Sequence, residues 1–566
     1  MWQLIAILLL NFYLSVSGEL CHLNTTSDLN CTHLHNIHLA VDETIDPCYD
    51  FYGYACNNWP HLSQNYEALL DHQMNLKMIT LTENLRADSL NTDFFNITHT
   101  YYRSCLRAKG RGNAIENILN IIKPAVTGLE WPILEVMRGK EENEWPVDRF
   151  DIFALLGKLL DYGLDHILLI TYKDASQQNF SSIKPQVILT LTENDISTVL
   201  GELIFNQKLR NDYTQRLVEI QQKLNDLSRQ FRFQGYSENG AQQFTFGELL
   251  QKFPYLQNYF ENSQLFENIK DDERFELRVP QYFEMLRQYK WSQGEKQDIC
   301  NYIMVAMLRH LLPARNDMSH TKLDCIREVR GKLELPLNLL YLDYYRPNEL
   351  IYDNDVYGIF SKLCEHLTED NPPPADFTSS NCSASELNVE NAPKSFYLPL
   401  LRKLFADIPD LQPDNFYQNF LHLLRHRAIK YIHNKETYYH IMVYGGLDQY
   451  HRRPFYNYAR KMLALPFVLL QTPLYHHSYD PLFKISSLGF TMAKYFPEID
   501  YYGLSRFYNN TMAGSMRGRT DAECIGDFGA ADLAYRTYRH YYGRQPEFTD
   551  DPWQRLFFIS LAQTYC

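Results

Sequence analysis

The sequence lacks the short motifs that identify several large classes of enzyme. It has no His-Glu-x-x-His for zinc hydrolysis, no Gly-x-Gly-x-x-Gly for dinucleotides and no Gly-x-Ser-x-Gly for a serine nucleophile. Basic residues are also not in excess, because 54 Lys and Arg stand against 68 Asp and Glu, giving a formal net charge of −14. A nucleic-acid partner is therefore not expected.

Long apolar runs are equally scarce, apart from one at the N-terminus. Residues 1–17 carry no Lys, Arg, Asp or Glu, and their apolar run ends at the small residues Ser17 and Gly18. The run is shorter than the ~20 residues that span a bilayer, so it predicts a signal peptide over 1–17 that is removed on secretion. An uncleaved signal anchor, which would leave the protein attached to a membrane, is the alternative.

Cysteine and glycosylation patterns agree with secretion. The chain has 11 Cys, and an odd number leaves at least one without an intrachain partner. Acceptors of the Asn-x-Ser/Thr type begin at Asn24, Asn30, Asn96, Asn179, Asn381 and Asn509. With the signal peptide, they predict an extracellular, disulfide-bonded glycoprotein.

Apolar periodicity predicts a mostly helical chain. Residues 18–45 are polar and are predicted to be an N-terminal tail. Helical spacing is found at 67–85, 153–160, 203–227, 299–312, 322–344, 356–367, 398–405, 416–432, 483–496, 522–542 and 553–564. Short apolar runs predict strands at 167–172, 187–191, 438–444 and 461–470, the first two as a pair.

Motifs near both ends of the chain carry a family resemblance. Residues 46–59 read DPCYDFYGYACNNW, residues 523–530 read ECIGDFGA, and residues 556–566 read LFFISLAQTYC. Together they resemble three segments of the neprilysin / endothelin-converting-enzyme family of zinc metallopeptidases. The resemblance implies a mainly α, two-lobed helical ectodomain with a small strand-containing, reduced thermolysin-like lobe. It places a neprilysin-like helical region at 46–435 and a reduced catalytic region at 436–566.

The zinc-binding positions of that family are altered here. Where the family has His-Glu-x-x-His, this chain has Lys494, Tyr495 and Glu498. The family's third ligand is matched by Glu523, and its ligand-orienting acid by Asp527, four residues on and so on the same helical face. A catalytic zinc needs three protein ligands and a bound water, whereas a lysine is cationic and repels a dication. Asp527 and Glu523 are free to pair locally instead, for example with Lys494.

Further departures point the same way. Pro497 lies inside the expected zinc helix, where it costs roughly 3 kcal/mol or ends the helix. Arg453-Pro454 stand at the family's substrate-binding Asn-Ala, and the chain ends at Cys566, before the family's transition-state His and substrate-binding Arg. We therefore expect a secreted pseudopeptidase with no zinc or other cofactor. It would bind extracellular peptides or proteins between its lobes, or pair with an active family member, with no nucleic acid or membrane as partner. The alternative is a residual zinc metalloendopeptidase acting on extracellular peptides.

Two pairs of histidines and one pair of carboxylates are further candidates for metal ligands. His422 and His426 are spaced i, i+4 on a predicted helix, but they lack the adjacent Glu, so two surface histidines are expected. His476 and His477 are neighbours in a predicted loop and are expected to point apart. Glu498 with Glu523 would offer a hard cation only two carboxylates.

The resemblance also implies a disulfide framework. It pairs Cys56 with Cys566 and Cys105 with Cys325, and it leaves Cys48 without its family partner. Proximity alone suggests the pairs Cys21–Cys31 and Cys364–Cys382. Nothing in the sequence assigns Cys300 or Cys524.

Overall fold

The chain passes between two structural units more than once. The computed structural model describes residues 27–566 except 60–64, 86–92, 109–111, 125–127, 165–166, 174–180, 186–190, 230, 232–240, 312–320, 346–348, 371–386, 389–393, 434–452, 458–461, 497–498, 500–520 and 543–551. Unit 1 is formed by 1–84, 333–399 and 439–566, and unit 2 by 85–332 and 400–438. The division expected from the sequence is linear, so it places 333–399 in the N-terminal region, although these residues pack with the C-terminal segment.

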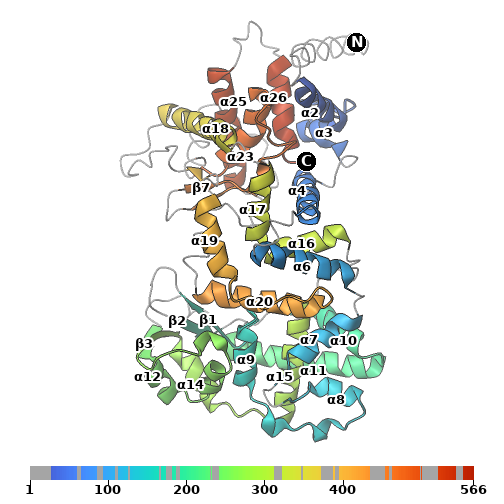
Figure 1. The fold of residues 1–566 in the computed structure, drawn as a ribbon, viewed down its shortest axis with the longest axis vertical. Coiled ribbons are helices and arrows are strands. Elements are labelled where there is room, and N and C mark those ends of the chain that lie inside the picture. The colour runs from blue at the N-terminus through green and yellow to red at the C-terminus, as the bar shows by residue number, and fades with distance from the viewer. Residues whose placement is uncertain are drawn as a thin grey trace. The chain divides into compact units, whose positions relative to one another are not determined.

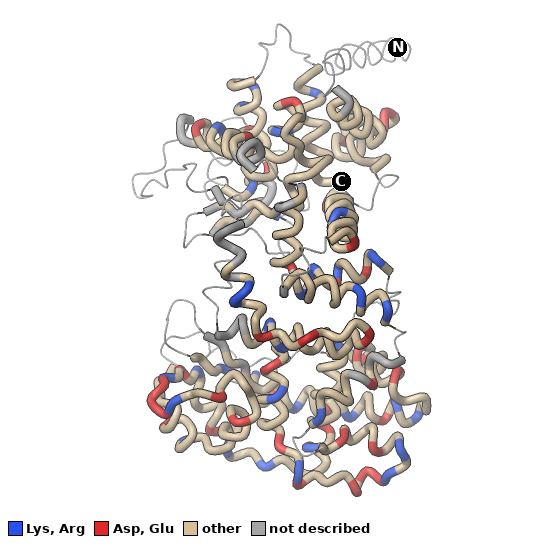
Figure 2. Tube along the Cα trace, in the orientation of Figure 1, with Lys and Arg blue, Asp and Glu red and all other residues tan. Residues whose placement is uncertain are grey.

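Unit 2 is a helical unit with one small sheet (Figure 1). Its helices are α6 (Asp93–Arg107), α7 (Gly112–Ile121), α8 (Pro132–Met137), η2 (Glu142–Glu144), η3 (Val147–Arg149), α9 (Ile152–Leu160), α10 (Glu193–Leu203), α11 (Gln207–Arg229), α12 (Phe246–Lys252), α13 (Leu256–Glu261), η6 (Gln264–Phe266), α14 (Pro280–Gln288), α15 (Gln293–Leu311), α16 (Lys322–Lys332) and α20 (Phe416–His433). Basic and acidic residues are interspersed along these helices (Figure 2). Helix α19 (Lys394–Phe405) joins the two units in sequence.

The sheet of unit 2 has the order β1-β2-β4-β3. Its strands are β1 (Leu169–Lys173), β2 (Ser181–Pro185), β3 (Ala241–Thr245) and β4 (Arg274–Arg278). The β1–β2 and β3–β4 pairs are antiparallel, and β2–β4 is parallel. The predicted strand at 167–172 is confirmed and pairs with β2, whereas residues 187–190 of the strand expected beside it lie outside the described part.

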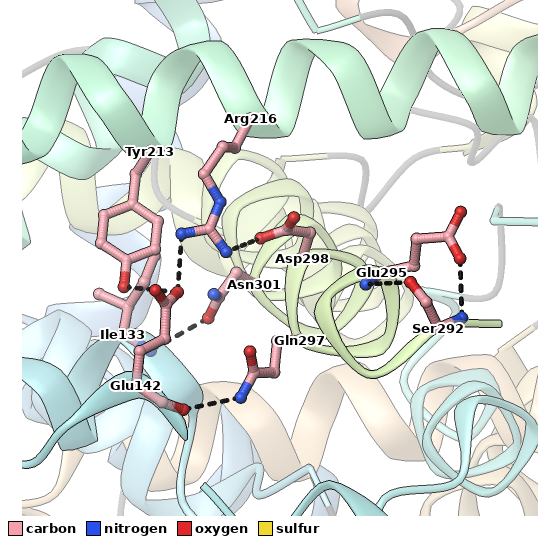
Figure 3. A network of polar contacts seen from close by, with 9 residues as sticks. All are labelled: Ile133, Glu142, Tyr213, Arg216, Ser292, Glu295, Gln297, Asp298 and Asn301. Carbon is pink, nitrogen blue, oxygen red and sulfur yellow. Dashed lines mark hydrogen bonds and ion pairs between the residues drawn. The ribbon is translucent and has the colours of Figure 1, made fainter. Parts of the chain in front are cut away.

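Polar contacts join the helices of unit 2 (Figure 3). Arg216 of α11 reaches Glu142 at 2.7 Å and Asp298 of α15 at 2.5 Å. Tyr213 donates its hydroxyl to Glu142 at 3.2 Å, and Gln297 donates to the Glu142 carbonyl at 2.8 Å. This network links α11 and α15 to η2 through one guanidinium that lies between two carboxylates, and we interpret it as structural.

Unit 1 contains the elements around the altered zinc positions. Its helices are α2 (Ser27–Ala40), α3 (Phe51–Cys56), α4 (Tyr66–Glu83), α17 (Glu334–Tyr345), α18 (Glu349–Asp370), η8 (Phe467–Leu469), α22 (Pro481–Lys484), the π-helix η9 (Ile485–Gly489), α23 (Phe490–Ala493), α25 (Asp521–Tyr541) and α26 (Pro552–Gln563). A three-stranded sheet has the order β5 (Leu387–Asn388), β7 (Met462–Ala464), β6 (Phe455–Asn457). The expected class, mainly α with a small strand-containing part, is confirmed.

The segment predicted to be a polar tail contains a packed helix. Residues 27–40 form α2, and Leu34, Ile37 and Ala40 are buried on one side of it. These residues are spaced by three, which is the helical repeat that sequence reasoning overlooked among the surrounding His, Asn and Thr. Helix α2 packs against α26, and Gln563 of α26 donates to the carbonyl of Ile37 at 2.9 Å.

Two further predictions at the level of elements need correction. The single helix expected at 322–344 is two helices, α16 and α17, interrupted at Leu333. The strand expected at 461–470 is limited to β7, because Pro466 follows and the chain then turns into η8. The strand expected at 438–444 lies outside the described residues.

Among the helices that the structure describes, none is both long and apolar enough to cross a membrane.

Candidate functional site: the altered zinc helix

The helix that should carry a zinc motif is continuous but ends early. Helices α22, η9 and α23 follow one another from Pro481 to Ala493, so the helix predicted at 483–496 is present and stops three residues sooner. Its buried face is polar in part, since Ser487 donates to the Leu474 carbonyl at 2.8 Å and Ser486 donates to Ser560 of α26 at 2.8 Å. Figure 1 shows this helix beside α25 and α26, which agrees with their contacts.

Lys494 lies in the turn after this helix and is held by two polar partners. Its ammonium is 2.9 Å from the Asp527 carboxylate of α25 and donates to the Tyr565 hydroxyl at 2.9 Å. It also lies 4.4 Å from the centre of the Tyr565 ring. The expected local pairing of Lys494 with a retained acid is therefore confirmed for Asp527. Glu523 is also in α25, but its side chain, together with Pro497 and Glu498, lies outside the described residues.

The charges around Lys494 oppose a metal cation there. Two unit charges ~4 Å apart interact by about 4 kcal/mol at an effective dielectric constant of about 20, and a dication doubles this. A zinc ion bound beside Asp527 would meet that repulsion from Lys494, and it would compete for a carboxylate that is already paired. Among the described residues, no group of three or more His, Cys, Asp and Glu is placed to hold a metal ion.

Arg453 and Glu67 form a second ion pair at the same site. Arg453 Nε lies 2.7 Å from Glu67 Oε1 of α4, with 69% and 40% of the two side chains exposed. Tyr495 lies near both, and burial raises the pKa of its phenol, with Arg453 acting in the opposite direction. Tyr495 therefore presents a neutral hydroxyl where an active enzyme would need a carboxylate general base.

A cavity of about 360 Å³, here called the Lys494 cavity, is lined by Lys494, Tyr495 and the Arg453–Glu67 pair, but not by Asp527. Its other walls include Tyr66, Leu70, Phe490, Thr491 and Tyr565. The sequence pointed to Lys494, Tyr495 and Asp527 but not to Glu67 or Tyr565. The one signal for Tyr565 was that a tyrosine replaces the tryptophan of the resembling family's last motif.

The histidines whose spacing suggested metal ligands lie in other surroundings. His426 has Nε2 2.7 Å from the Leu404 carbonyl and stacks on Phe405, and burial lowers the pKa of His422. His476 and His477 lie in a loop as expected, but their rings do not point apart: the ring centres are 4.4 Å from each other. Ser478 N also donates to His476 Nδ1 at 3.1 Å, which restrains that ring.

The disulfides expected from the resemblance are confirmed. Cys56 pairs with Cys566 in unit 1, and Cys105 pairs with Cys325 in unit 2, with Cα atoms 5.4 and 5.6 Å apart. Cys48 is exposed and Cys300 is buried, and neither forms a disulfide with another described residue. Cys31 and Cys364 are also disulfide-bonded, to partners outside the described residues, so their pairings stay predictions.

Two of the predicted glycosylation acceptors can be compared in the structure. Asn96 lies exposed on α6, whereas Asn30 is half-buried on α2. The Asn30 amide donates to the Ser478 carbonyl at 3.3 Å, and its oxygen accepts from Asp480 N at 2.9 Å. Asn24, Asn179, Asn381 and Asn509 lie outside the described residues.

The chain belongs to peptidase family M13. The model of this family matches residues 47–350, which is more than half of the chain. This confirms the metallopeptidase resemblance, although the match ends before Lys494 and so does not bear on the zinc positions. No curated protein sequence matches the chain.

Solved structures share the fold across most of the chain. A Haemonchus protein described as a galactose-containing glycoprotein complex is similar at 14% identity and a TM-score of 0.57, covering 94% of this chain and 88% of its own. The zinc metalloprotease Zmp1 of Mycobacterium tuberculosis, solved with an inhibitor, is similar at 13% identity and a TM-score of 0.55, with 93% and 90% covered. PepO from Lactobacillus rhamnosis has 12% identity and a TM-score of 0.56, with 88% and 86% covered.

Proposed function

We propose that this protein is a secreted M13-family pseudopeptidase that binds extracellular peptides or proteins without cleaving them. The observation that carries the proposal is the Lys494–Asp527 ion pair. A fixed ammonium occupies the place where the family's zinc helix presents a neutral imidazole, and it takes up the carboxylate that would orient a ligand. Two disulfides with large sequence separations support an oxidising compartment, and with it secretion.

The Lys494 cavity is the proposed binding site. Its apolar and aromatic walls suit peptide side chains. The Thr491 hydroxyl donates to the Ser487 carbonyl at 2.8 Å, so its oxygen can accept from a peptide N–H. Both cationic residues of the cavity are matched by Asp527 and Glu67, so binding does not depend on a charged ligand group. An active relative is a further proposed partner, and neither a nucleic acid nor a membrane is proposed.

Metal content and turnover test the inactive state. After dialysis against micromolar zinc, the purified protein should hold well under one equivalent by elemental analysis. Quenched fluorescent peptides should stay uncleaved with or without a chelator. One equivalent of zinc together with chelator-sensitive cleavage would establish the alternative, a residual zinc metalloendopeptidase.

Peptide binding is tested by filling the cavity. Peptides captured from extracellular fluid are identified by mass spectrometry, synthesised and titrated against the wild type and Thr491→Trp. The indole should occupy the Lys494 cavity and weaken binding at least tenfold. Thr80→Trp, a matched change at an exposed position on α4, should bind like the wild type. Equal affinity of Thr491→Trp and the wild type would remove the cavity as the binding site.

A further inference from the structure

Tyr49 of unit 1 presents nearly its whole side chain to solvent. Its exposed fraction of 93% is the largest of any large apolar or aromatic side chain in the described part of the chain. It lies in a turn, because the amides of Tyr49 and Asp50 both donate to the Asp46 carbonyl at 3.0 Å. The Asp50 carboxylate accepts from Gly53 N at 2.8 Å and caps α3. Backbone and capping bonds therefore hold the phenol at the surface.

The segment around Tyr49 is acidic. It carries four carboxylates, those of Asp42, Glu43, Asp46 and Asp50. No Lys or Arg occurs in residues 1–76. Arg555 of α26 lies near Tyr54 in space, but its single positive charge does not offset four negative ones. The surface that presents the phenol is therefore negative.

Local hydrogen bonds leave these carboxylates ionised. Asp42 accepts from the Thr44 hydroxyl at 2.6 Å and from the Asn57 amide, and these bonds lower the pKa of Asp42. Asp46 accepts from Cys48 N at 2.9 Å. All of these donors are neutral, so they stabilise the charged form of each carboxyl without cancelling its charge.

The other exposed tyrosines among the described residues lack this combination. Tyr52 is 55% exposed, but its hydroxyl donates to the Tyr565 carbonyl at 3.4 Å. Tyr344 and Tyr542 are also exposed, yet each has an arginine two positions further along the chain. Exposure, a negative surface and the absence of nearby basic residues in the sequence therefore coincide at Tyr49.

This combination suits a particular kind of group transfer. An enzyme that binds an anionic nucleotide donor surrounds it with cationic side chains, which attract an acidic acceptor segment and repel a basic one. A sulfotransferase that uses phosphoadenylyl sulfate is such an enzyme, and proteins meet it on the secretory route. The choice of sulfate over phosphate therefore rests on the secretion included in the proposed function.

We propose that Tyr49 is a tyrosine sulfation site, with Asp46 and Asp50 as the charges that guide recognition. The phenol oxygen attacks the sulfur of the sulfuryl group and forms an O–S bond. The bond between that sulfur and the phosphate oxygen of the donor breaks, and adenosine bisphosphate leaves with the electron pair. The phenol proton passes to a base of the transferase. A neutral hydroxyl is thereby replaced by a permanent negative charge.

Sulfation of the purified full-length protein tests the site without reference to secretion. With a tyrosylprotein sulfotransferase and labelled phosphoadenylyl sulfate, the wild type should take up a single sulfuryl group, which peptide mass spectrometry should place on Tyr49. Tyr49→Phe should lose at least nine-tenths of the label. Tyr52→Phe, in the same acidic segment, is the matched control and should be labelled like the wild type. Undiminished labelling of Tyr49→Phe, or no labelling of the wild type, would overturn the proposal.

Two double variants test the role of charge. Asp46→Asn with Asp50→Asn keeps the side-chain oxygens that accept from the backbone and removes two charges. The kcat/KM of sulfation should fall at least fivefold. Asp271→Asn with Asp272→Asn, at exposed positions in unit 2, changes the net charge equally and should react like the wild type. Equal rates for the two double variants would show that these carboxylates do not guide recognition.

Protein from the medium of secreting cells separates this inference from the proposed function. Tyr49 should carry a group that alkaline phosphatase does not remove and that is lost when the cells grow in chlorate, which blocks synthesis of the donor. Secreted protein with an unmodified or phosphorylated Tyr49 would overturn the inference and leave secretion standing. Retention of the chain inside the cells would contradict secretion, while sulfation of the purified protein would still decide the site.

Discussion

At the scale of single residues, Lys494 shows how one substitution changes several properties of a site. A histidine there would be a neutral ligand, whereas the lysine brings a positive charge and three donors. Its ammonium uses Asp527, the Tyr565 hydroxyl and the Tyr565 ring, so three groups that face the site now stabilise the side chain itself. Restoring a metal would thus require separating an existing set of contacts.

The contacts of Asn30 predict that this residue is not glycosylated. Its side-chain nitrogen, the atom that would carry a glycan, donates to the Ser478 carbonyl, and the neighbouring Cys31 is disulfide-bonded. We expect Asn30 to be unmodified and the exposed Asn96 to carry a glycan. Enzymatic deglycosylation in heavy-oxygen water, followed by peptide mass spectrometry, reads each site separately. A fully occupied Asn30 would mean that α2 does not pack against the 478–480 loop in the mature protein.

His33 predicts that stability falls in mild acid. Burial lowers its folded-state pKa to about 3, whereas an unfolded histidine has a pKa of about 6.5. Below about pH 6.5 the unfolded chain therefore binds a proton that the folded chain cannot, and the free energy of unfolding decreases by up to about 3 kcal/mol by pH 4. His476 adds in the same direction, because burial, followed by His477, Lys484 and Lys77, lowers its pKa to about 4.

The His33 contribution can be isolated by its pH window. Carboxylates affect stability mainly below about pH 5, so the interval from 6.5 to 5 reports on histidines. In His33→Phe the melting temperature of unit 1 should decrease less across this interval than in the wild type. His72→Phe should retain the wild-type slope. Identical slopes for wild type and His33→Phe would show that His33 is hydrated in solution.

At the scale of elements, apolar-rich helices were predictable from the sequence and some polar ones were not. Helices α4, α9, α25 and α26 end within about two residues of their predicted bounds. Helices α6 and α14 each have one apolar face, but they were not predicted, because polar and charged residues dominate their composition. Helix α2 was missed although its buried residues are spaced by three, because polar residues surround them. The break between α16 and α17 has no signal in the apolar spacing.

The candidate site also contains some residues that the sequence predicted and others that it did not. Lys494 and Asp527 could be named from motifs, and their pairing followed from opposite charge. Glu67 and Tyr565 could not be placed, because the first lies 386 positions from its partner Arg453 and the second 71 positions from Lys494.

The early end of α23 predicts the outcome of restoring the zinc motif. In Lys494→His, Tyr495→Glu, Glu498→His, the two new imidazoles share one helical face only if the helix continues beyond Ala493. Pro497 disfavours this, because the residue before a proline avoids the α conformation. We expect zinc uptake well below one equivalent and peptide cleavage near background.

A fourth substitution separates the helix from the ligands. Adding Pro497→Thr removes the helix breaker and should raise zinc content above that of the triple variant, while cleavage stays near background. Lys494→His alone is the control and should bind no zinc. Efficient chelator-sensitive cleavage by the triple variant would mean that only the ligands were lost.

At the scale of the whole molecule, each unit contains a disulfide between cysteines that are far apart in the sequence. Cys56–Cys566 joins the first and last stretches of unit 1 over 510 positions, and Cys105–Cys325 closes 220 positions of unit 2. Closing loops of this length stabilises a fold by about 5–6 kcal/mol in the chain-entropy model. Unit 1 is assembled from three separate stretches of the chain and unit 2 from two. The stability of unit 1 should therefore depend more on its disulfide than that of unit 2.

The two disulfides should therefore act on different unfolding transitions. Scanning calorimetry of the wild type is expected to show two transitions. Cys56→Ser with Cys566→Ser should lower one of them, and Cys105→Ser with Cys325→Ser should lower the other. Limited proteolysis identifies each transition, because the first variant should be cut within 333–399 and 453–566 while 93–332 stays intact. If either variant lowered both transitions together, the units would unfold as one cooperative body, and their division would describe packing without independent stability.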